Sequence, residues 1–353
     1  MNIQLLQNLS ETSRVAWVGE LPPVLSYQAI SAPLDGSRIY RSHPELHQRF
    51  DVVFLVEQDL GALKHWRQTL DDVLRLISPG GRLVLKFSES SFLSIYALKF
   101  FLSNWTNREV AIESEFRNLD GQYTIGLRLT RLTKREDSLD DWTFAIISDG
   151  KRPEAVQTFV ESVLRLQGLD KFEILICGPN PLFPLPPQLR VITPPEQFQT
   201  QGWITRKKNE IVAAAQYSNL VVAHDRYVLP SDFLKKMYLY GGDFDVLTPR
   251  QETLDGSRFP DWVTVGSDWN WSPGALMEPH DDSPFGYLNG GFIIAKTAIL
   301  RETPWNDLLF WNQAEDVELT RQLANRGRVH RYAPSVVVIS TVARQQYVRD
   351  FLK

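Results

Sequence analysis

Apolar runs and amphipathic segments alternate along the first 130 residues of the chain. The pattern predicts strands at 14–21 and 50–60, a helix at 62–77, and a tight glycine turn into a further strand at 78–87. A strand, a helix, a glycine turn and a strand in this order are typical of a parallel βαβ sheet. Residues 108–132 then predict a terminal hairpin with Asp120 and Gly121 at its turn.

The same alternation resumes after a charged stretch at 131–142, which lacks apolar periodicity and predicts a linker. Strands are expected at 142–148, 171–177, 219–225, 244–250 and 290–296, and helices at 152–166, 204–217, 229–240 and 314–327. A chain of 353 residues is too long for one ordinary domain. We therefore expect two α/β domains, at 1–135 and 136–353.

The composition is that of a soluble globular protein, with 43% hydrophobic and 23% charged residues. A net charge of −4 gives no electrostatic reason to expect nucleic acid as a partner. Cys177, the single cysteine, lies in an apolar run and is expected to be a small buried hydrophobe. The N-terminus shows no signal-peptide pattern, and no apolar run is long enough to span a bilayer, so a cytoplasmic location is expected.

Three polar groups interrupt the apolar pattern, namely ISDGKRP at 147–153, HDR at 224–226 and QAED at 313–316. The first two follow strands, and open α/β sheets bind ligands beyond the carboxyl ends of their strands. Asp149 could contact a ribose or base, with Lys151 and Arg152 beside it for phosphate. An ordinary Asp-Gly turn before a helix explains the first group equally well. The acids of the third group are also favoured at any helix start, by about 0.3–1 kcal/mol each.

The order of these groups resembles that of inverting family 2 glycosyltransferases of the GT-A fold. The resemblance is carried by ITRKKNEIVAAAQYSNLVVAHDRYVLP at 204–230, YLNGGFIIAK at 287–296 and WNQAEDVELTRQL at 311–323. In that family a helix with a basic residue and Asn precedes a strand closed by an acidic motif. A glycine-containing acceptor strand and an acidic pair opening a later helix follow.

The resemblance implies a role for each matching residue. Asp225 would bind a divalent cation, Mn²⁺ or Mg²⁺, which offsets charge on the departing diphosphate, and His224 would be a second ligand or a phosphate contact. Asp316 would be the base that takes the acceptor proton, and Glu315 would orient acceptor or sugar. The other implied contacts are Lys207, Lys208 and Asn209 with pyrophosphate or sugar, and Asn289, Gly290, Gly291 and Trp311 with the acceptor. Arg226 replaces an acid found in many relatives, and it could cap the diphosphate or pair with Asp225.

The N-terminal segment resembles the second half of a class I S-adenosylmethionine-dependent methyltransferase, through residues 50–60 and LRLISPGGRLVL at 74–85. The first strand of that family ends in a glycine-rich loop, whereas here Gly19 is followed by Pro22 and Pro23. The sequence therefore predicts a shortened Rossmann-like sheet that does not bind S-adenosylmethionine. We expect it to be a scaffold or docking domain.

These observations favour an enzyme that moves a sugar from a nucleotide-diphosphate donor to a hydroxyl of a glycan. Association with a partner enzyme, or peripherally with a membrane, is compatible with the sequence. Two alternatives are a non-catalytic assembly platform made of two degenerate nucleotide-type domains, and a methyltransferase.

Overall fold

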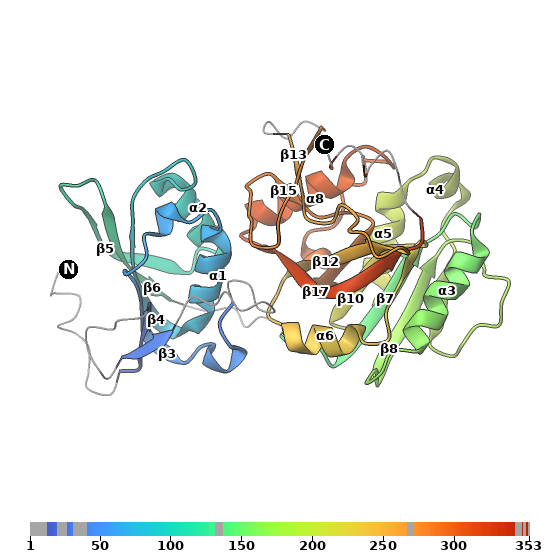
Figure 1. Ribbon diagram of the computed structural model, residues 1–353, viewed down its shortest axis with the longest axis horizontal. Coiled ribbons are helices and arrows are strands. Elements are labelled where there is room, and N and C mark those ends of the chain that lie inside the picture. Colours follow the sequence, from blue (N-terminus) through green and yellow to red (C-terminus); the bar gives the residue numbers. More distant parts are fainter. Residues whose placement is uncertain are drawn as a thin grey trace. The chain divides into compact units, whose positions relative to one another are not determined.

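The computed structural model describes residues 13–19, 27–30, 41–130, 137–266 and 272–342, together with 348 and 351. The chain forms two compact units (Figure 1), one of residues 1–135 with 325–327 and one of residues 136–324 with 328–353. Of the predicted linker, residues 131–136 lie outside the described residues, and β7 begins at Asp141.

The N-terminal unit is built on a six-stranded sheet in the order β2-β1-β3-β4-β6-β5. Its strands are β1 (Val15–Val18), β2 (Gln28–Ile30), β3 (Phe50–Leu55), β4 (Ile77–Phe87), β5 (Val110–Arg117) and β6 (Tyr123–Leu129). Its helices are α1 (Trp66–Leu76) and α2 (Ile95–Trp105), with short 3-10 turns at Pro44–Leu46 and Leu60–Ala62. The first four strands of the sheet are parallel, and β5 and β6 form the predicted antiparallel hairpin. Gly121 has a φ of +86° in the hairpin turn, where a residue with a β-carbon would be strained.

The end of β1 is contacted by a side chain that follows β3, its neighbour in the sheet. Glu57 accepts a hydrogen bond of 2.7 Å from Trp17 Nε1. A β-carbon on Gly19 would lie 1.9 Å from Glu57 Oε2, so this glycine leaves room for a carboxylate of the chain itself. The likeness of this unit to methyltransferases stays a prediction.

The C-terminal unit is built on an eight-stranded mixed sheet in the order β11-β17-β12-β16-β10-β7-β8-β9. Its strands are β7 (Asp141–Ile147), β8 (Lys171–Cys177), β9 (Leu189–Ile192), β10 (Asn219–His224), β11 (Tyr227–Val228), β12 (Val246–Thr253), β16 (Phe292–Lys296) and β17 (His330–Ser340). The four strands from β10 to β9 are parallel to one another, and β16 runs antiparallel to β10 and β12. The α/β class predicted from the sequence is confirmed.

Helices cover both faces of this sheet (Figure 1). They are α3 (Pro153–Leu164), α4 (Glu196–Thr200), α5 (Ile204–Ala214), α6 (Phe233–Tyr240), α7 (Thr297–Glu302) and α8 (Glu315–Asn325). Alternate residues of the strands point to opposite faces, so each strand contributes to two cores. Apolar residues of α3 and α6, such as Phe159 and Phe233, are buried with Phe144 and Ile146 on one face. Apolar residues of α5, α7 and α8, such as Ile211, Leu300 and Leu319, are buried with Ala145 on the other face of the sheet.

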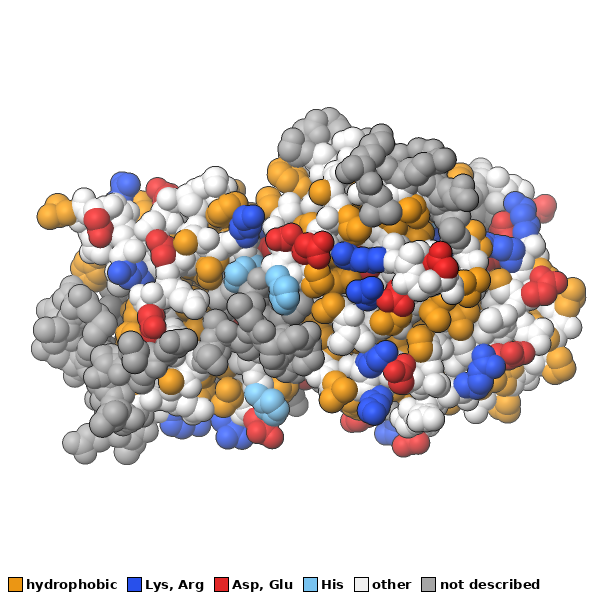
Figure 2. Space-filling view, viewed as in Figure 1, with side chains coloured by type: hydrophobic (Ala, Val, Ile, Leu, Met, Phe, Trp, Pro, Cys, Tyr) orange, Lys and Arg blue, Asp and Glu red, His pale blue; other side chains and the backbone are white. Residues whose placement is uncertain are grey.

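The described helices include none that is both long and apolar enough to cross a membrane. Figure 2 shows basic and acidic side chains interspersed with apolar ones on the visible face of the C-terminal unit. This mixture provides no single-sign surface field on that face.

A small sheet lies beside the main one, formed by β13 (Val263–Val265), β14 (Pro273–Leu276) and β15 (Gly286–Tyr287). Asp261, which is fully buried, ties it to the main sheet. Its carboxylate accepts hydrogen bonds from Gln251 N at 2.9 Å, Tyr332 Oη at 2.9 Å and Arg258 Nη2 at 2.8 Å. These donors come from β12, β17 and the loop between β12 and β13, so one carboxylate fixes three segments.

We predict that Asp261→Ala lowers the free energy of unfolding by about 3 kcal/mol or more, because it leaves the partly buried guanidinium of Arg258 and buried donors without their acceptor. Asp232→Ala is the matched control, since Asp232 pairs with Lys236 at the surface, and its expected cost is a few tenths of a kcal/mol. Urea unfolding of both variants measures the difference. Equal midpoints would contradict this role of Asp261.

Candidate active site

Three segments meet at one edge of the main sheet. β7 and β10 are parallel neighbours with Ile147 opposite His224, so the residues that follow them leave the sheet side by side. His224 N donates a hydrogen bond of 2.9 Å to Gly291 O, which brings in the turn before β16. The polar groups predicted at the ends of β7 and β10 therefore lie together, as expected for an open α/β sheet.

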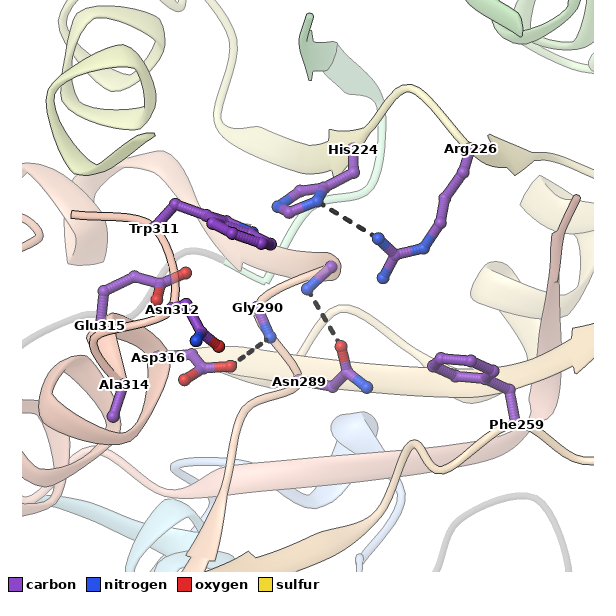
Figure 3. A pocket seen from close by; sticks show the side chains of 11 residues that line it. His224, Arg226, Phe259, Asn289, Gly290, Trp311, Asn312, Ala314, Glu315 and Asp316 are labelled. Atoms are coloured by element: carbon purple, nitrogen blue, oxygen red, sulfur yellow. Dashed lines mark hydrogen bonds between the residues drawn. The ribbon is translucent and has the colours of Figure 1, made fainter. Parts of the chain in front are cut away.

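Two cavities open at this edge, and His224 and Trp311 line both. The first, which we call the acid cavity, has a volume of about 100 Å³ and contains Arg226, Glu315 and Asp316. The second, the cation cavity, has a volume of about 520 Å³ and contains Lys151, Arg152, Lys207, Asp149 and Asp225. Figure 3 shows His224, Trp311 and the two carboxylates around the acid cavity.

Asp316 lies in the first turn of α8, with its carboxylate on the acid cavity. Its Oδ2 accepts a hydrogen bond of 3.0 Å from Gly290 N, and Oδ1 accepts one of 2.9 Å from Val317 N (Figure 3 shows the first). Burial and the neighbouring Glu315 carboxylate raise the pKa of Asp316 to about 7, against a partial opposing effect of Lys208. A carboxylate with a pKa in this range is suited to accept a proton near neutral pH.

Glu315 is buried beside it and pairs with a fully buried lysine. Lys208 Nζ lies 3.2 Å from Glu315 Oε1 and donates to Gly290 O at 3.2 Å. Lys208 therefore connects α5, the turn before β16 and α8. Its role differs from the predicted contact with pyrophosphate, because its ammonium is neutralised inside the protein and lines neither cavity.

Asn209, the next residue on α5, also lies outside both cavities. Its side chain donates to Trp305 O at 2.9 Å and Asp307 Oδ1 at 2.8 Å, and accepts from Trp305 N at 3.0 Å. The predicted contact with pyrophosphate or sugar is thus replaced by a structural role, in which Asn209 anchors the loop that leads to Trp311. Lys207 and Lys208 on the same helix are both buried.

The predicted acceptor residues all line the acid cavity, but the two glycines serve a different purpose. A β-carbon on Gly290 would lie 2.9 Å from Asp316 Oδ2, and one on Gly291 would lie 2.4 Å from Arg226 Nη2. The space that a side chain would need is therefore filled by functional groups of the protein, rather than kept open for a sugar ring.

Asn289 and Trp311 differ in how much they offer a ligand. Asn289 Nδ2 donates to Pro260 O at 2.7 Å and its Oδ1 accepts from Gly291 N at 3.0 Å, so this buried amide shapes the turn. Trp311 is 55% exposed and belongs to both cavities. An exposed indole between two polar cavities is a suitable platform for the apolar face of a sugar.

Arg226 enters the acid cavity, although the sequence placed it with the nucleotide contacts. It is 4% exposed, its Nη2 donates to Tyr227 Oη at 3.2 Å, and its guanidinium lies over the rings of Tyr227 and Phe259. Its Nη1 lies 3.4 Å from His224 Nδ1 (Figure 3). Phe259 and Gln199, which line the two cavities, lie in segments without apolar periodicity and gave no signal in the sequence.

The cation cavity holds paired charges at its mouth. Lys151 Nζ lies 3.2 Å from Asp149 Oδ2, and Arg152 forms an ion pair with Asp225, which is itself 3% exposed. Burial raises the pKa of Asp225, while Arg152 acts in the opposite direction. Lys207 Nζ donates to Ser148 O at 3.0 Å and to Gln199, and burial lowers the pKa of this lysine.

These residues do not fit the divalent cation that the sequence predicts at Asp225. The carboxylate is already bound by Arg152, and Arg226 and Lys207 are close enough to influence its charge. Among the described residues, His, Cys, Asp and Glu side chains form no group of three that could hold a metal ion. Hard divalent cations take several oxygen ligands, which this mainly basic surrounding does not supply.

The element order implied by the resemblance to GT-A glycosyltransferases is present in the C-terminal unit. The basic helix is α5, the acidic strand end follows β10, the glycine turn precedes β16, and the acidic pair begins α8. These four elements converge on one sheet edge, in the order that the resemblance implies.

Comparisons with known proteins give similarity to solved structures only. No protein-family model matches the chain, and no curated protein matches it. The crystal structure of S. aureus TarS 1-349 is 12% identical, over 57% of this chain and 60% of that chain, with a TM-score of 0.37. GalNAc-T7 with UDP, GalNAc and Mn²⁺ is 11% identical, over 61% and 48%, with a TM-score of 0.45.

A second TarS 1-349 structure, in complex with UDP-GlcNAc, is 12% identical over 60% of this chain and 62% of that one, with a TM-score of 0.39. The chain thus spans less than two thirds of the length of each neighbour. Similarity at TM-scores below 0.5 carries no argument about what this chain binds or catalyses.

The raised pKa of Asp316 predicts how stability depends on pH. The folded protein binds this proton more tightly than the unfolded chain, so Asp316 destabilises the fold increasingly as the pH rises from about 4 to about 7. Asp316→Asn removes this charge, and we expect it to raise the free energy of unfolding by roughly 4 kcal/mol at pH 8 and by little at pH 4. Urea unfolding at both pH values tests this, and a gain of the same size at pH 4 would contradict it.

Proposed function

We propose that the C-terminal unit is a glycosyltransferase that moves a sugar from a nucleotide-diphosphate donor to a hydroxyl of a glycan. The observation that carries the proposal is the meeting of a basic cavity and an acidic one at His224 and Trp311. The larger, basic cavity suits a nucleoside diphosphate, and the acid cavity suits the acceptor. The donor sugar would lie against Trp311, between the two.

The proposed reaction needs a base on one side of the sugar and positive charge on the other. The acceptor O–H bond breaks as its proton passes to the Asp316 carboxylate, and the oxygen forms a bond to the anomeric carbon. The bond from that carbon to the diphosphate oxygen breaks, and its electron pair leaves on the nucleoside diphosphate. Attack from the face opposite the leaving group inverts the anomeric configuration. The arrangement of Asp316 and the cation cavity on either side of Trp311 supports this course.

Glu315 has a positioning role in this proposal. Its pair with Lys208 fixes the start of α8, and its negative charge contributes to the raised pKa of Asp316. A base whose pKa lies near neutrality is mostly ionised above pH 7 and still takes up a proton readily.

The N-terminal unit completes the proposal as a docking or scaffold domain for the acceptor or a partner enzyme. Glu57 beside Gly19 supports this role over that of a methyltransferase, because a carboxylate lies where that family brings its cofactor close to the backbone.

We predict that Asp316→Asn lowers the transfer rate by roughly 100- to 10,000-fold, the usual contribution of a general base, while donor affinity stays within about threefold. Transfer is measured by mass spectrometry of glycan acceptors supplied with a panel of nucleotide sugars, and donor affinity by calorimetry. Full activity in the variant would remove the base assignment. No transfer and no donor binding by the wild-type protein would instead favour a non-catalytic platform.

The pH dependence of kcat/KM gives a second prediction. Activity should fall below a midpoint near pH 7 as Asp316 is protonated. Glu315→Gln removes the adjacent negative charge and keeps an oxygen for Lys208, so the midpoint should move to lower pH. The pH–rate profile of both proteins measures this shift. If the midpoint does not move, the group that titrates is not Asp316.

A further inference from the structure

The cation cavity is lined by three positive side chains and two carboxylates, and Arg226 lines the acid cavity that shares His224 with it. Of these four cations, Lys151 pairs with Asp149 and Arg152 pairs with Asp225. Lys207 and Arg226 make no ion pair among the described residues. Both are 4% exposed, so neither is solvated as a surface lysine or arginine would be.

Lys207 is held by neutral acceptors alone. Its Nζ donates to Ser148 O and to the side-chain oxygen of Gln199, both on the wall of the cation cavity. A buried ammonium whose bonded partners are a carbonyl and an amide is costly, because neither partner offsets its charge. The lowered pKa of Lys207 reflects the same cost.

Arg226 is held by aromatic rings and by two weak polar contacts. Its guanidinium lies 4.9 Å from the ring centre of Tyr227 and 5.9 Å from that of Phe259. Its Nε is buried and has no hydrogen-bond partner in the described structure. Guanidinium groups normally satisfy their fixed set of donors with carboxylate or phosphate oxygens, so this geometry favours an anionic ligand.

The charge balance decides which ligand fits. In the cation cavity, three cations outnumber the carboxylates of Asp149 and Asp225, and a diphosphate would neutralise this excess of positive charge. A divalent cation would add to that excess, and it would have to displace Arg152 from Asp225 to gain its ligand.

We propose that the diphosphate of the donor lies where the two cavities meet at His224, bound directly by Arg152 and Lys207 from the cation cavity and by Arg226 from the acid cavity. Asp225 positions Arg152, so the donor binds without a divalent cation. The inference rests on the proposed function and specifies how its donor is recognised. Asp225 is then a positioning residue, in contrast to the metal ligand that the resemblance implies. The same three cations would stabilise the charge that develops on the departing diphosphate.

Calorimetry with inorganic pyrophosphate and with UDP, GDP and dTDP tests this on the full-length protein, in excess EDTA and again with Mn²⁺. We expect binding of pyrophosphate and of at least one nucleotide in EDTA, with no gain from Mn²⁺. Arg226→Met and Lys207→Met should each weaken this binding roughly tenfold or more. Lys235→Met, an exposed residue of α6 outside both cavities, is the matched control and should leave binding unchanged.

Two further readouts separate ligand binding from folding. The Arg226→Met and Lys207→Met proteins should melt at the same temperature as the wild type or higher without ligand, because a buried unpaired charge is removed. Asp225→Asn should keep pyrophosphate affinity within about threefold, since a negative charge near the ligand disappears. A metal ligand at this position would instead make the substitution abolish binding.

Three other outcomes would contradict the inference. Binding that requires Mn²⁺ and is lost in Asp225→Asn overturns the inference but leaves the proposed glycosyltransferase intact. Binding in EDTA that neither methionine variant weakens also overturns it. If no nucleotide binds with or without Mn²⁺, the inference and the proposed function both fail.

Discussion

The buried ion pair between Lys208 and Glu315 is the contact on which the geometry of the site depends. It links the middle of α5 to the first turn of α8, and the same ammonium holds the carbonyl of Gly290. Buried pairs of this kind contribute little net stability, because desolvation offsets their attraction, but loss of one partner is costly. Such pairs instead fix the relative positions of the segments that they join. Here the pair holds the first turn of α8 next to the turn before β16. Asp316 in that helix turn can therefore accept a hydrogen bond from Gly290 N.

Burial of charge gives the two cavities opposite chemistry within a short distance. In the acid cavity, desolvation and a neighbouring carboxylate make Asp316 a stronger base than an exposed aspartate. Desolvation likewise makes Lys207 in the cation cavity and Arg226 at the edge of the acid cavity strong partners for an anion. Both effects destabilise the ligand-free protein, as is common where a fold keeps groups ready for binding or catalysis.

The sequence predicted most of the long elements of the fold, because their apolar spacing is strong, but it did not predict α2 or β17. β8 was expected at 171–177 and lies at Lys171–Cys177. The short elements, such as β9 and the three strands of the small sheet, were missed because four or fewer residues carry too little periodicity. In the site, the sequence identified the charged residues that line the cavities, but it missed Phe259 and Gln199 and could not assign Lys208 and Asn209. Neighbouring positions on a helix point in different directions, and only tertiary packing determines which of them faces a ligand.

The antiparallel direction of β16 has a consequence for the chemistry of the whole edge. Its neighbour β10 ends there, whereas β16 begins there. Strands that end at an edge present outgoing carbonyls and the side chains of the loops that follow. The turn before a strand that begins at the same edge adds backbone N–H groups. One of them is the N–H of Gly290, which donates to Asp316. A uniformly parallel sheet would place such donors at its far end. The reversal of one strand therefore gives this protein backbone donors and acidic side chains within a single rim.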